Sequence, residues 1–235
     1  MSLFEKLFQK AGKKIITIDG EYGSGANEIA KKVADKLNYE LFDEKLIELM
    51  SLEKKVKPEE IKKDDSFLQG TIYDLYRQNY SYSQEDIATN DAAFLLDSRT
   101  IREIAKNKKA VIFGKCGDFV LEDFPKLSVF IYASKEFEEE RILNTYNIKK
   151  DKLEIKMTRE NNRRANHYSR NTGRVWGEAH NYDILINSSS FDFESIANLI
   201  VEMSQNRKWK TWRKSGFFYA KIYKIFKENI HLINY

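Results

Sequence analysis

Short apolar runs alternate along the chain with longer segments in which apolar residues recur at helical spacing. Residues 15–19 form the first run, and Ile29, Val33 and Leu37 then repeat at the spacing of one helix face. Between them, the glycine-rich sequence GEYGSG interrupts both patterns. The pattern therefore predicts a strand, a glycine loop and a helix in that order.

Four further apolar runs predict strands, at residues 39–43, 110–114, 126–133 and 182–189. Helical spacing predicts helices at 44–51, in two or three pieces across 67–107, and at 134–146. Strands without strict apolar–polar alternation, separated by helices, are typical of a parallel sheet covered on both faces. The predicted fold class is α/β, with a parallel β-sheet flanked by helices.

Three segments differ in composition from this alternating part. Residues 1–13 form a short amphipathic lead-in, which is too weakly apolar for a signal peptide or a membrane span. Residues 53–66 are charge-rich around a proline, and we expect a mobile connector or a short surface helix there. Residues 207–235 are basic and aromatic. The main domain is therefore expected to cover residues 14–206.

The composition supports a folded protein, and the charge is unevenly distributed. The 235 residues are 42% hydrophobic, enough for a core, and 40 Lys and Arg face 36 Asp and Glu. Residues 207–235 hold eight basic residues and one acid, so this segment carries +7 and the rest of the chain −3. The single cysteine, Cys116, cannot form an internal disulfide, which favours a cytoplasmic location.

The glycine loop has the local sequence of a phosphate site. Glycines between a strand and a helix allow successive backbone N–H groups to point inward, and the helix N-terminus adds positive potential. Gly20 and Gly25 fit the pattern G-x-x-x-x-G-K-[ST], but Ala26 stands in the lysine position and Asn27 in the hydroxyl position. From the loop alone, phosphate binding and simple tight packing are equally good interpretations.

Five arginines form a second cluster: Arg159, Arg163, Arg164, Arg170 and Arg174. Guanidinium groups stay protonated and suit the charge that spreads over a phosphoryl group during its transfer. An isolated arginine-rich stretch is more often a solvated helix face. The glycine loop elsewhere in the chain favours the functional interpretation.

Metal and thiol chemistry have little support in the sequence. The histidines, at 167, 180 and 231, lie far apart without ligand-type spacing, so no transition-metal site is predicted. Cys116 follows a predicted strand and has no histidine nearby in the sequence, so a buried structural thiol is favoured over a reactive one.

The basic and aromatic segment 207–235 has several interpretations. A terminal helix could pack its aromatic residues on the core, or bind an anionic membrane surface or an acidic protein partner. Membrane binding would make the protein peripheral. No nucleic-acid motif accompanies the charge, so no specific nucleic-acid partner is predicted.

Three stretches, at residues 16–47, 110–121 and 164–189, together resemble the cytidylate kinase-like family of P-loop nucleoside-monophosphate kinases. The third contains R-A-N-x-Y, T-G-x-x-W-G, N-Y-D and I-N-S-S, and it is the most specific. The resemblance covers roughly residues 14–205. It implies a helical acceptor-binding part at about 44–107 and a basic lid at about 150–180.

The resemblance also implies an activity and a set of site residues. The reaction is transfer of the ATP γ-phosphoryl group, with Mg²⁺, to a pyrimidine nucleoside monophosphate, CMP or dCMP first. The nucleotide-binding residues are Gly20, Gly23, Ser24, Gly25, Ala26, Asn27 and Glu28. Catalysis is assigned to Arg164 with Arg159 and Arg163. Acceptor binding is assigned to Asp43, Lys115, Arg170 and Arg174.

Some positions depart from the family pattern. Asn27 replaces a basic residue, Asn161 stands where relatives tend to carry an acid, and Lys115 replaces an arginine. A nucleotide-binding pseudokinase, or a regulatory module with a docking tail, is therefore the alternative to an active kinase. The sequence leaves the oligomeric state open.

Overall fold

The computed structural model describes residues 15–53, 84–146 and 150–205. The predictions for the lead-in (1–13), for nearly all of the connector (53–66) and for the basic and aromatic segment (207–235) lie outside these residues. They remain predictions.

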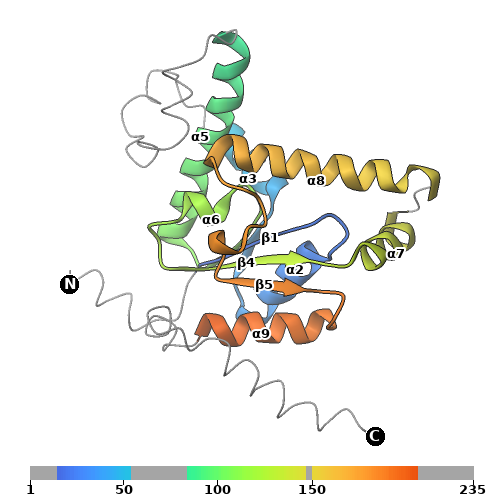
Figure 1. The fold of residues 1–235 in the computed structure, drawn as a ribbon. Coiled ribbons are helices and arrows are strands. Elements are labelled where there is room, and N and C mark those ends of the chain that lie inside the picture. Colours follow the sequence, from blue (N-terminus) through green and yellow to red (C-terminus); the bar gives the residue numbers. More distant parts are fainter. Residues whose placement is uncertain (1–14, 54–83, 147–149, 206–235) are drawn as a thin grey trace, which may run out of the picture.

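Five strands form one parallel sheet in the order β2-β3-β1-β4-β5 (Figure 1). The strands are β1 (Ile15–Gly20), β2 (Glu40–Phe42), β3 (Ala110–Phe113), β4 (Lys126–Tyr132) and β5 (Ile184–Asn187). Each coincides with a predicted strand, and the ends differ by one or two residues. Because β1 pairs with both β3 and β4, the loop that follows it lies at the centre of the sheet edge.

The helices connect and cover these strands. They are α2 (Ala26–Leu37), α3 (Glu44–Glu53), α5 (Gln84–Asn107), α6 (Gly117–Val120), α7 (Lys135–Tyr146), α8 (Lys150–Thr172), the 3₁₀ turn η2 (Ala179–Asn181) and α9 (Phe193–Gln205). The predicted helices at 44–51 and 134–146 are confirmed. Within 67–107 the structure describes residues 84–107, which form one helix, α5, and the rest of that prediction lies outside the described residues.

The last helix, α9, was not predicted. Its apolar residues Ile196, Ala197 and Ile200 repeat at helical spacing and are buried. Its start is capped by Asp192, whose Oδ1 accepts the backbone N–H of Ser195 at 2.8 Å. The signals of a helix were therefore present in the sequence.

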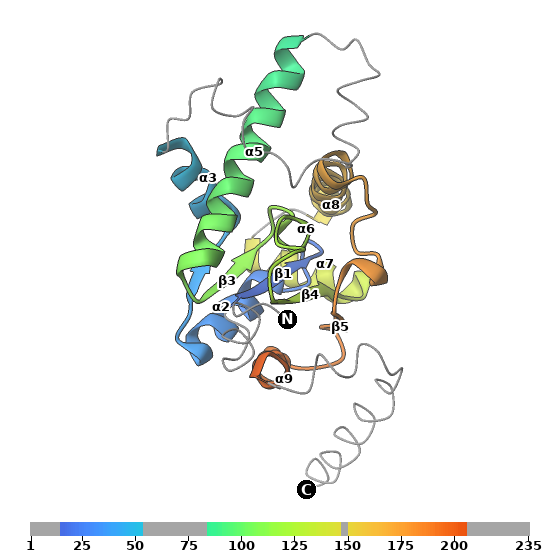
Figure 2. The same cartoon turned by 90° about the vertical axis from the view of Figure 1, so that its left-hand side faces the viewer.

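The core is divided by the sheet into two apolar clusters. On β1, Ile16 and Ile18 pack with α2 and α9, whereas Ile15 packs with residues of α5 and α6. This alternation follows from the two-residue side-chain period of a strand. Figures 1 and 2 accordingly show α2 and α9 on one face, with α5 and α6 on the other.

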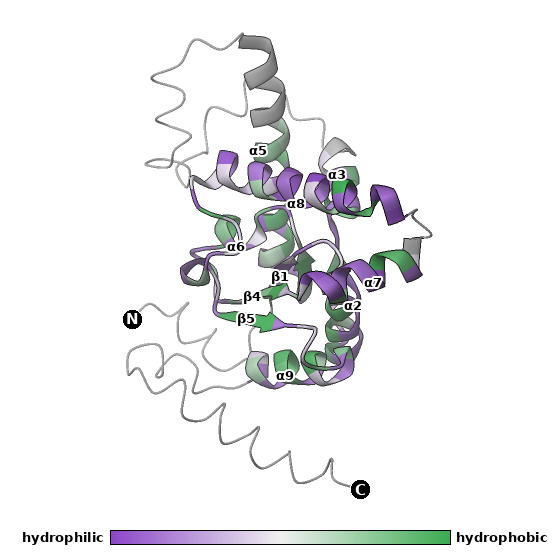
Figure 3. Ribbon diagram, turned by 45° about the vertical axis from the view of Figure 1, so that its right-hand side comes forward, coloured by the Kyte–Doolittle hydropathy of each residue, from purple (hydrophilic) through white to green (hydrophobic). Residues whose placement is uncertain are grey.

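The basic helix α8 is largely hydrophilic along its length (Figure 3). Tyr168 anchors it, since this side chain is 1% exposed and its hydroxyl donates to Asp118 Oδ2 at 2.6 Å. Arg164 of the same helix reaches the carbonyl of Gly20 at the end of β1. The arginine-rich helix therefore lies against the sheet edge that carries the glycine loop.

Candidate active site

The phosphate loop, residues 20–25, has a backbone that glycine alone fits at two points. Gly23 and Gly25 have φ of 101° and 80°, in the left-handed region. A Cβ on Gly25 would lie 2.2 Å from the Phe193 ring, and one on Gly23 would lie 2.8 Å from Glu138 Cβ. Packing on the outside of the loop therefore requires these glycines before any ligand is considered.

Backbone hydrogen bonds shape the first half of this loop. The N–H of Glu21 donates to the carbonyl of Ile131 at 3.0 Å, and the N–H of Ser24 donates to the carbonyl of Glu21 at 3.2 Å. The Ser24 hydroxyl donates to the same Glu21 carbonyl at 2.8 Å. Ser24 is fully buried, and its N–H and hydroxyl both serve the loop while its carbonyl accepts the Ser188 hydroxyl at 2.7 Å, so these groups are not available for the predicted nucleotide contact.

The second half of the loop presents the start of α2. Gly25 is the N-cap, and Ala26, Asn27 and Glu28 form the first turn. The N–H groups of a first helical turn have no acceptor within their own helix and face outward with the positive end of the helix dipole. These four predicted nucleotide-binding positions are therefore brought together, with Ala26 buried and Asn27 exposed.

Arg164 is the predicted catalytic residue that reaches the phosphate loop. Its Nη1 donates to the carbonyl of Gly20 at 2.7 Å, and its guanidinium lies 5.7 Å from the centre of the Phe113 ring. Its Nε is buried and has no partner in the described part of the chain. One guanidinium donor is therefore anchored on the loop carbonyl, and the buried Nε is left unpaired among these residues.

The other arginines of the cluster lie elsewhere. Arg163 pairs with Glu160 and lies 3.6 Å from Glu44, and the exposed Arg159 pairs with Glu160 at 3.3 Å. Arg174 forms an ion pair with Glu122 at 2.9 Å, while Arg170 is exposed on α8. The structure thus brings Arg164 to the loop and Arg163 near it. Arg159 and Arg174 are held by acidic neighbours instead.

Arg141 of α7 is a loop contact that the sequence analysis missed. Its Nε donates to the carbonyl of Gly23 at 2.9 Å, and its Nη2 pairs with Glu28 at 2.7 Å. Its guanidinium also lies 4.7 Å from the centre of the Phe193 ring. No glycine motif or basic cluster marks this residue in the sequence, because its partners are far away along the chain.

A group of polar residues on the other side of Arg164 forms what we call the acceptor cluster: Glu44, Ser51, Asp97, Lys115 and His167. Lys115 Nζ donates to Asp97 Oδ2 at 2.9 Å, and Asp97 Oδ1 accepts the Ser51 hydroxyl at 2.8 Å. Glu44 Oε1 lies 3.9 Å from Arg164 Nη2. Burial, and then the nearby Lys115 charge, lower the pKa of His167, whose Nε2 has no partner among the described residues.

The turn that presents Lys115 is strained. Gly114, Lys115 and Cys116 have consecutive positive φ values of 74°, 53° and 54°. Non-glycine residues in this region cost of order 1–3 kcal/mol each, and such strain is typical of functional sites. Cys116 is 2% exposed and burial raises its thiol pKa, in agreement with the prediction of a structural thiol.

Asp43 has a local structural contact. Its Oδ1 accepts the backbone N–H of Leu46 at 2.8 Å, which caps the start of α3. The residue that approaches the arginines is its neighbour, Glu44. The sequence analysis did not single out Glu44, and the assignment of Asp43 to acceptor binding stays a prediction.

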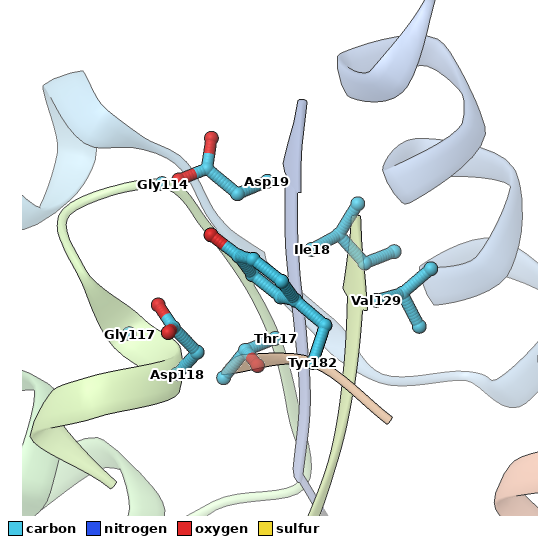
Figure 4. Close-up of a pocket in the computed structure, with 8 residues that line it drawn as sticks. All are labelled: Thr17, Ile18, Asp19, Gly114, Gly117, Asp118, Val129 and Tyr182. Atoms are coloured by element: carbon cyan, nitrogen blue, oxygen red, sulfur yellow. The ribbon is translucent and has the colours of Figure 1, made fainter. Parts of the chain in front are cut away.

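Two buried carboxyl groups lie beneath the loop, with the Tyr182 side chain between them (Figure 4). Asp19 accepts the N–H of Gly20 at 2.8 Å and the indole N–H of Trp176 at 3.0 Å. Burial raises the pKa of Asp19 to about 7, although the Trp176 hydrogen bond and the Arg164 charge oppose this. Burial also raises the pKa of Asp118. A carboxyl that titrates near neutral pH therefore lies directly behind the first loop glycine.

Within the described residues, no three histidine, cysteine or acidic side chains converge as metal ligands. No helix of the described part is long and apolar enough to cross a membrane.

A glycine loop between the central strand of a parallel sheet and a helix, with an arginine of α8 bound to that loop, is the arrangement of a P-loop kinase fold. The family model described as cytidylate kinase-like matches residues 15–190. The chain belongs to this cytidylate kinase-like family.

Individual relatives agree with this assignment. The chain is 26% identical to the cytidylate kinase of Archaeoglobus fulgidus over 207 residues, which cover 85% of this chain and 99% of that protein. It is 26% identical to the cytidylate kinase of Fusobacterium nucleatum over 156 residues, covering 58% and 72%. The crystal structure of an uncharacterized protein from Eubacterium ventriosum shares the fold, with a TM-score of 0.61, 21% identity and coverage of 81% and 97%. Family and fold support a nucleotide kinase role.

Proposed function

We propose that this protein transfers the γ-phosphoryl group of ATP to a pyrimidine nucleoside monophosphate, with CMP or dCMP as the acceptor. The observation that carries the proposal is the position of Arg164. Its guanidinium is bound to the first glycine of the phosphate loop and lies beside Glu44 of the acceptor cluster. It therefore stands between a donor site and an acceptor site.

On the donor side, the backbone N–H groups of residues 25–28 and the start of α2 would hold the triphosphate. Magnesium would arrive with ATP and be held mainly by the phosphates. The exposed side-chain oxygen of Asn27 is the protein ligand that we assign to it. The ion would neutralise charge on the phosphates.

On the acceptor side, Lys115 would face the phosphate of the monophosphate, and Arg163 would lie near it. The ion pair with Asp97 fixes the position of the Lys115 ammonium group. The Lys115 side chain is 17% exposed and that of Asp97 is 8% exposed. Asp43, Arg170 and Arg174 are weaker candidates, because Asp43 caps a helix and Arg174 is paired with Glu122. Arg159, which is paired with Glu160, is a weaker candidate for catalysis.

Catalysis would consist of positioning and charge neutralisation. The acceptor phosphate attacks the γ-phosphorus in line, ADP leaves, and no covalent enzyme intermediate forms. Arg164 would donate to the oxygens of the transferring group, where negative charge spreads in the transition state. Asp19 would keep this arginine near the loop through its negative charge.

A second function, nucleotide binding without turnover, is favoured by one observation. Ala26 is buried in the position of the loop lysine, so no charged side chain extends from the loop over the phosphates. Asn161 of α8 also accepts the backbone N–H of Tyr22 at 2.8 Å, which ties the lid helix to the loop. A loop of this kind could bind a nucleotide without accelerating transfer.

A coupled assay of ADP release with CMP, dCMP, UMP and AMP separates the two functions. We expect ATP-dependent turnover with CMP or dCMP and its loss in Arg164→Ala. ATP binding in calorimetry without turnover for any of the four acceptors would support the binding module instead. Absence of both binding and turnover would contradict both functions.

A further inference from the structure

Two carboxyl groups meet behind the phosphate loop. Glu138 of α7 is 5% exposed, and its Oε1 is buried without a hydrogen-bond partner in the described part of the chain. Glu21, the second residue of the loop, accepts the backbone N–H of Ala133 through Oε2 at 3.3 Å. The side chains of Glu138 and Glu21 interact with each other directly.

The loop backbone packs tightly on Glu138. A Cβ on Gly23 would lie 2.8 Å from Glu138 Cβ and 3.1 Å from its Cα, so the loop and the helix touch at this residue. The N–H of Glu21 is in turn bound to the carbonyl of Ile131 on β4. Helix α7 therefore packs directly on the phosphate loop at Glu138.

No cation balances this pair among the described residues. Arg141, the nearest arginine on α7, is bound to the Gly23 carbonyl and to Glu28. Lys135, at the start of α7, is paired with Glu154 and Glu139. The N–H of Ala133, directly after β4, donates to Glu21 of this pair. Helix α8 contributes the apolar residues Leu153 and Met157, which pack with Tyr22.

We propose that Glu138 is a positioning residue of the phosphate loop that works as a neutral acid: its carboxyl proton is donated to ionised Glu21, and this bond holds the first half of the loop against β4 and α7. Two ionised carboxylates enclosed together repel each other strongly, whereas a carboxylic acid and a carboxylate form a charge-assisted hydrogen bond. The geometry of the loop therefore depends on one proton.

The titration of the pair agrees with this arrangement. Burial, followed by the charge of Glu21, raises the pKa of Glu138 to about 8. The hydrogen bond from the Ala133 N–H and that from Glu138 both favour the ionised form of Glu21, although burial raises its pKa overall. The proton is consequently held at neutral pH and lost in mildly alkaline solution.

This inference rests on the proposed function insofar as the loop binds ATP, and two measurements keep the two claims separate. The first is ATP affinity by calorimetry between pH 7 and 9.5, for the wild type, Glu138→Gln and Glu138→Ala. We expect the wild type to lose about tenfold in affinity over this range as the second charge appears. Glu138→Gln, whose amide donates permanently, should change by less than twofold. Glu138→Ala should bind weakly at every pH.

The second measurement needs no nucleotide. A group whose pKa is raised by folding stabilises the native state fully below its ordinary pKa, and this contribution is lost as pH rises towards the folded value. The thermal unfolding midpoint of the wild type should therefore fall by several degrees between pH 5.5 and 8.5 relative to Glu138→Gln. Glu140→Gln, an exposed change on the same helix, serves as the matched control and should follow the wild type.

Parallel pH profiles for the wild type and Glu138→Gln in the unfolding experiment would overturn the inference. So would equal loss of ATP affinity in both proteins at alkaline pH. If no variant binds ATP at any pH, the proposed function fails, and the unfolding profiles alone decide whether Glu138 holds its proton.

Discussion

The proposed donor and acceptor sides of the site are built from different groups. Around the phosphate loop, glycines, carbonyls and backbone N–H groups make most of the contacts, as in the left-handed Gly25 and the Gly20 carbonyl bound by Arg164. Around the acceptor cluster, charged side chains pair with one another, as Lys115 does with Asp97. A backbone site tolerates changes in side-chain chemistry but no added volume, whereas a site made of side chains depends on their charge and reach.

This contrast explains why the sequence departures matter unequally. Ala26 and Asn27 depart from the usual loop, yet the backbone cup and the start of α2 are still formed. Lys115 replaces a planar guanidinium by a point charge in a site that depends on side chains. We therefore expect the acceptor side to differ more from the family pattern in its binding properties than the donor side does.

The largest effect is expected where the two sides meet. Arg164→Ala should lower kcat by about 10³-fold, because the transferring group loses a fixed donor. ATP affinity should change much less, since the backbone cup remains. Steady-state kinetics and calorimetry on the same preparation check this, with the exposed Lys152→Ala of the same helix as the control. A kcat close to the wild-type value would remove Arg164 from the mechanism.

On the donor side, added side-chain volume alone should weaken ATP binding. Gly25→Ala should weaken ATP binding by about 100-fold, because the added carbon meets the Phe193 ring and the left-handed backbone disfavours alanine. The double variant Gly25→Ala/Phe193→Ala removes the ring but keeps the backbone constraint. In calorimetry, full recovery of ATP affinity in the double variant would mean that the Phe193 ring alone required glycine, whereas unchanged affinity in Gly25→Ala would mean that the loop is a packing turn and does not hold phosphate.

The acceptor side should respond to charge geometry. Lys115→Met should raise the KM for CMP by about tenfold and leave the KM for ATP within twofold, because a charge-assisted contact to phosphate is lost. It also leaves Asp97 buried without its cation, so Lys115→Met/Asp97→Asn is the matched control. Lys115→Arg should restore the acceptor KM. Equal changes in both KM values would mean that the residue acts on the whole fold.

The last prediction concerns stability rather than activity, at the buried acid beneath the loop. Because folding raises the pKa of Asp19 from 3.8 to about 7, its contribution to stability is complete below pH 4 and is lost as pH rises to 7. The wild type should therefore lose about 2–4 kcal/mol of unfolding free energy between pH 4.5 and 7 relative to Asp19→Asn. Denaturant unfolding at several pH values measures this, and the exposed Asp35→Asn should follow the wild type.

The parts of the fold that could be predicted are those encoded locally. The five strands, the glycine loop and the helix after it each occupy one continuous stretch, so apolar spacing and turn residues were sufficient. The helix α9 also carried its signals, an apolar stripe and Asp192 as its cap, but they were not used.

The contacts that complete the site could not be predicted, because they join distant residues. Trp176 lies 157 positions from Asp19, and Arg141 lies 118 positions from Gly23. No spacing rule links such residues; only the strand order brings them together. The same reason explains why Glu44 was not singled out beside Asp43, since its approach to Arg163 and Arg164 depends on how the fold brings α3 and α8 together.

Because Phe193 packs on Gly25, the position of α9 affects the conformation of the phosphate loop. Phe193 is the first residue of α9, and its ring covers the glycine that caps α2. Both helices are held to the same face of the sheet, in part through Ile196 and Ile200, which belong to the apolar cluster beneath α2. Substitutions that weaken the packing of α9 at these two positions would allow the Phe193 ring to move away from Gly25. The phosphate loop would then become more mobile. Substitutions there are therefore expected to shorten the residence time of a bound nucleotide without altering any group that contacts it.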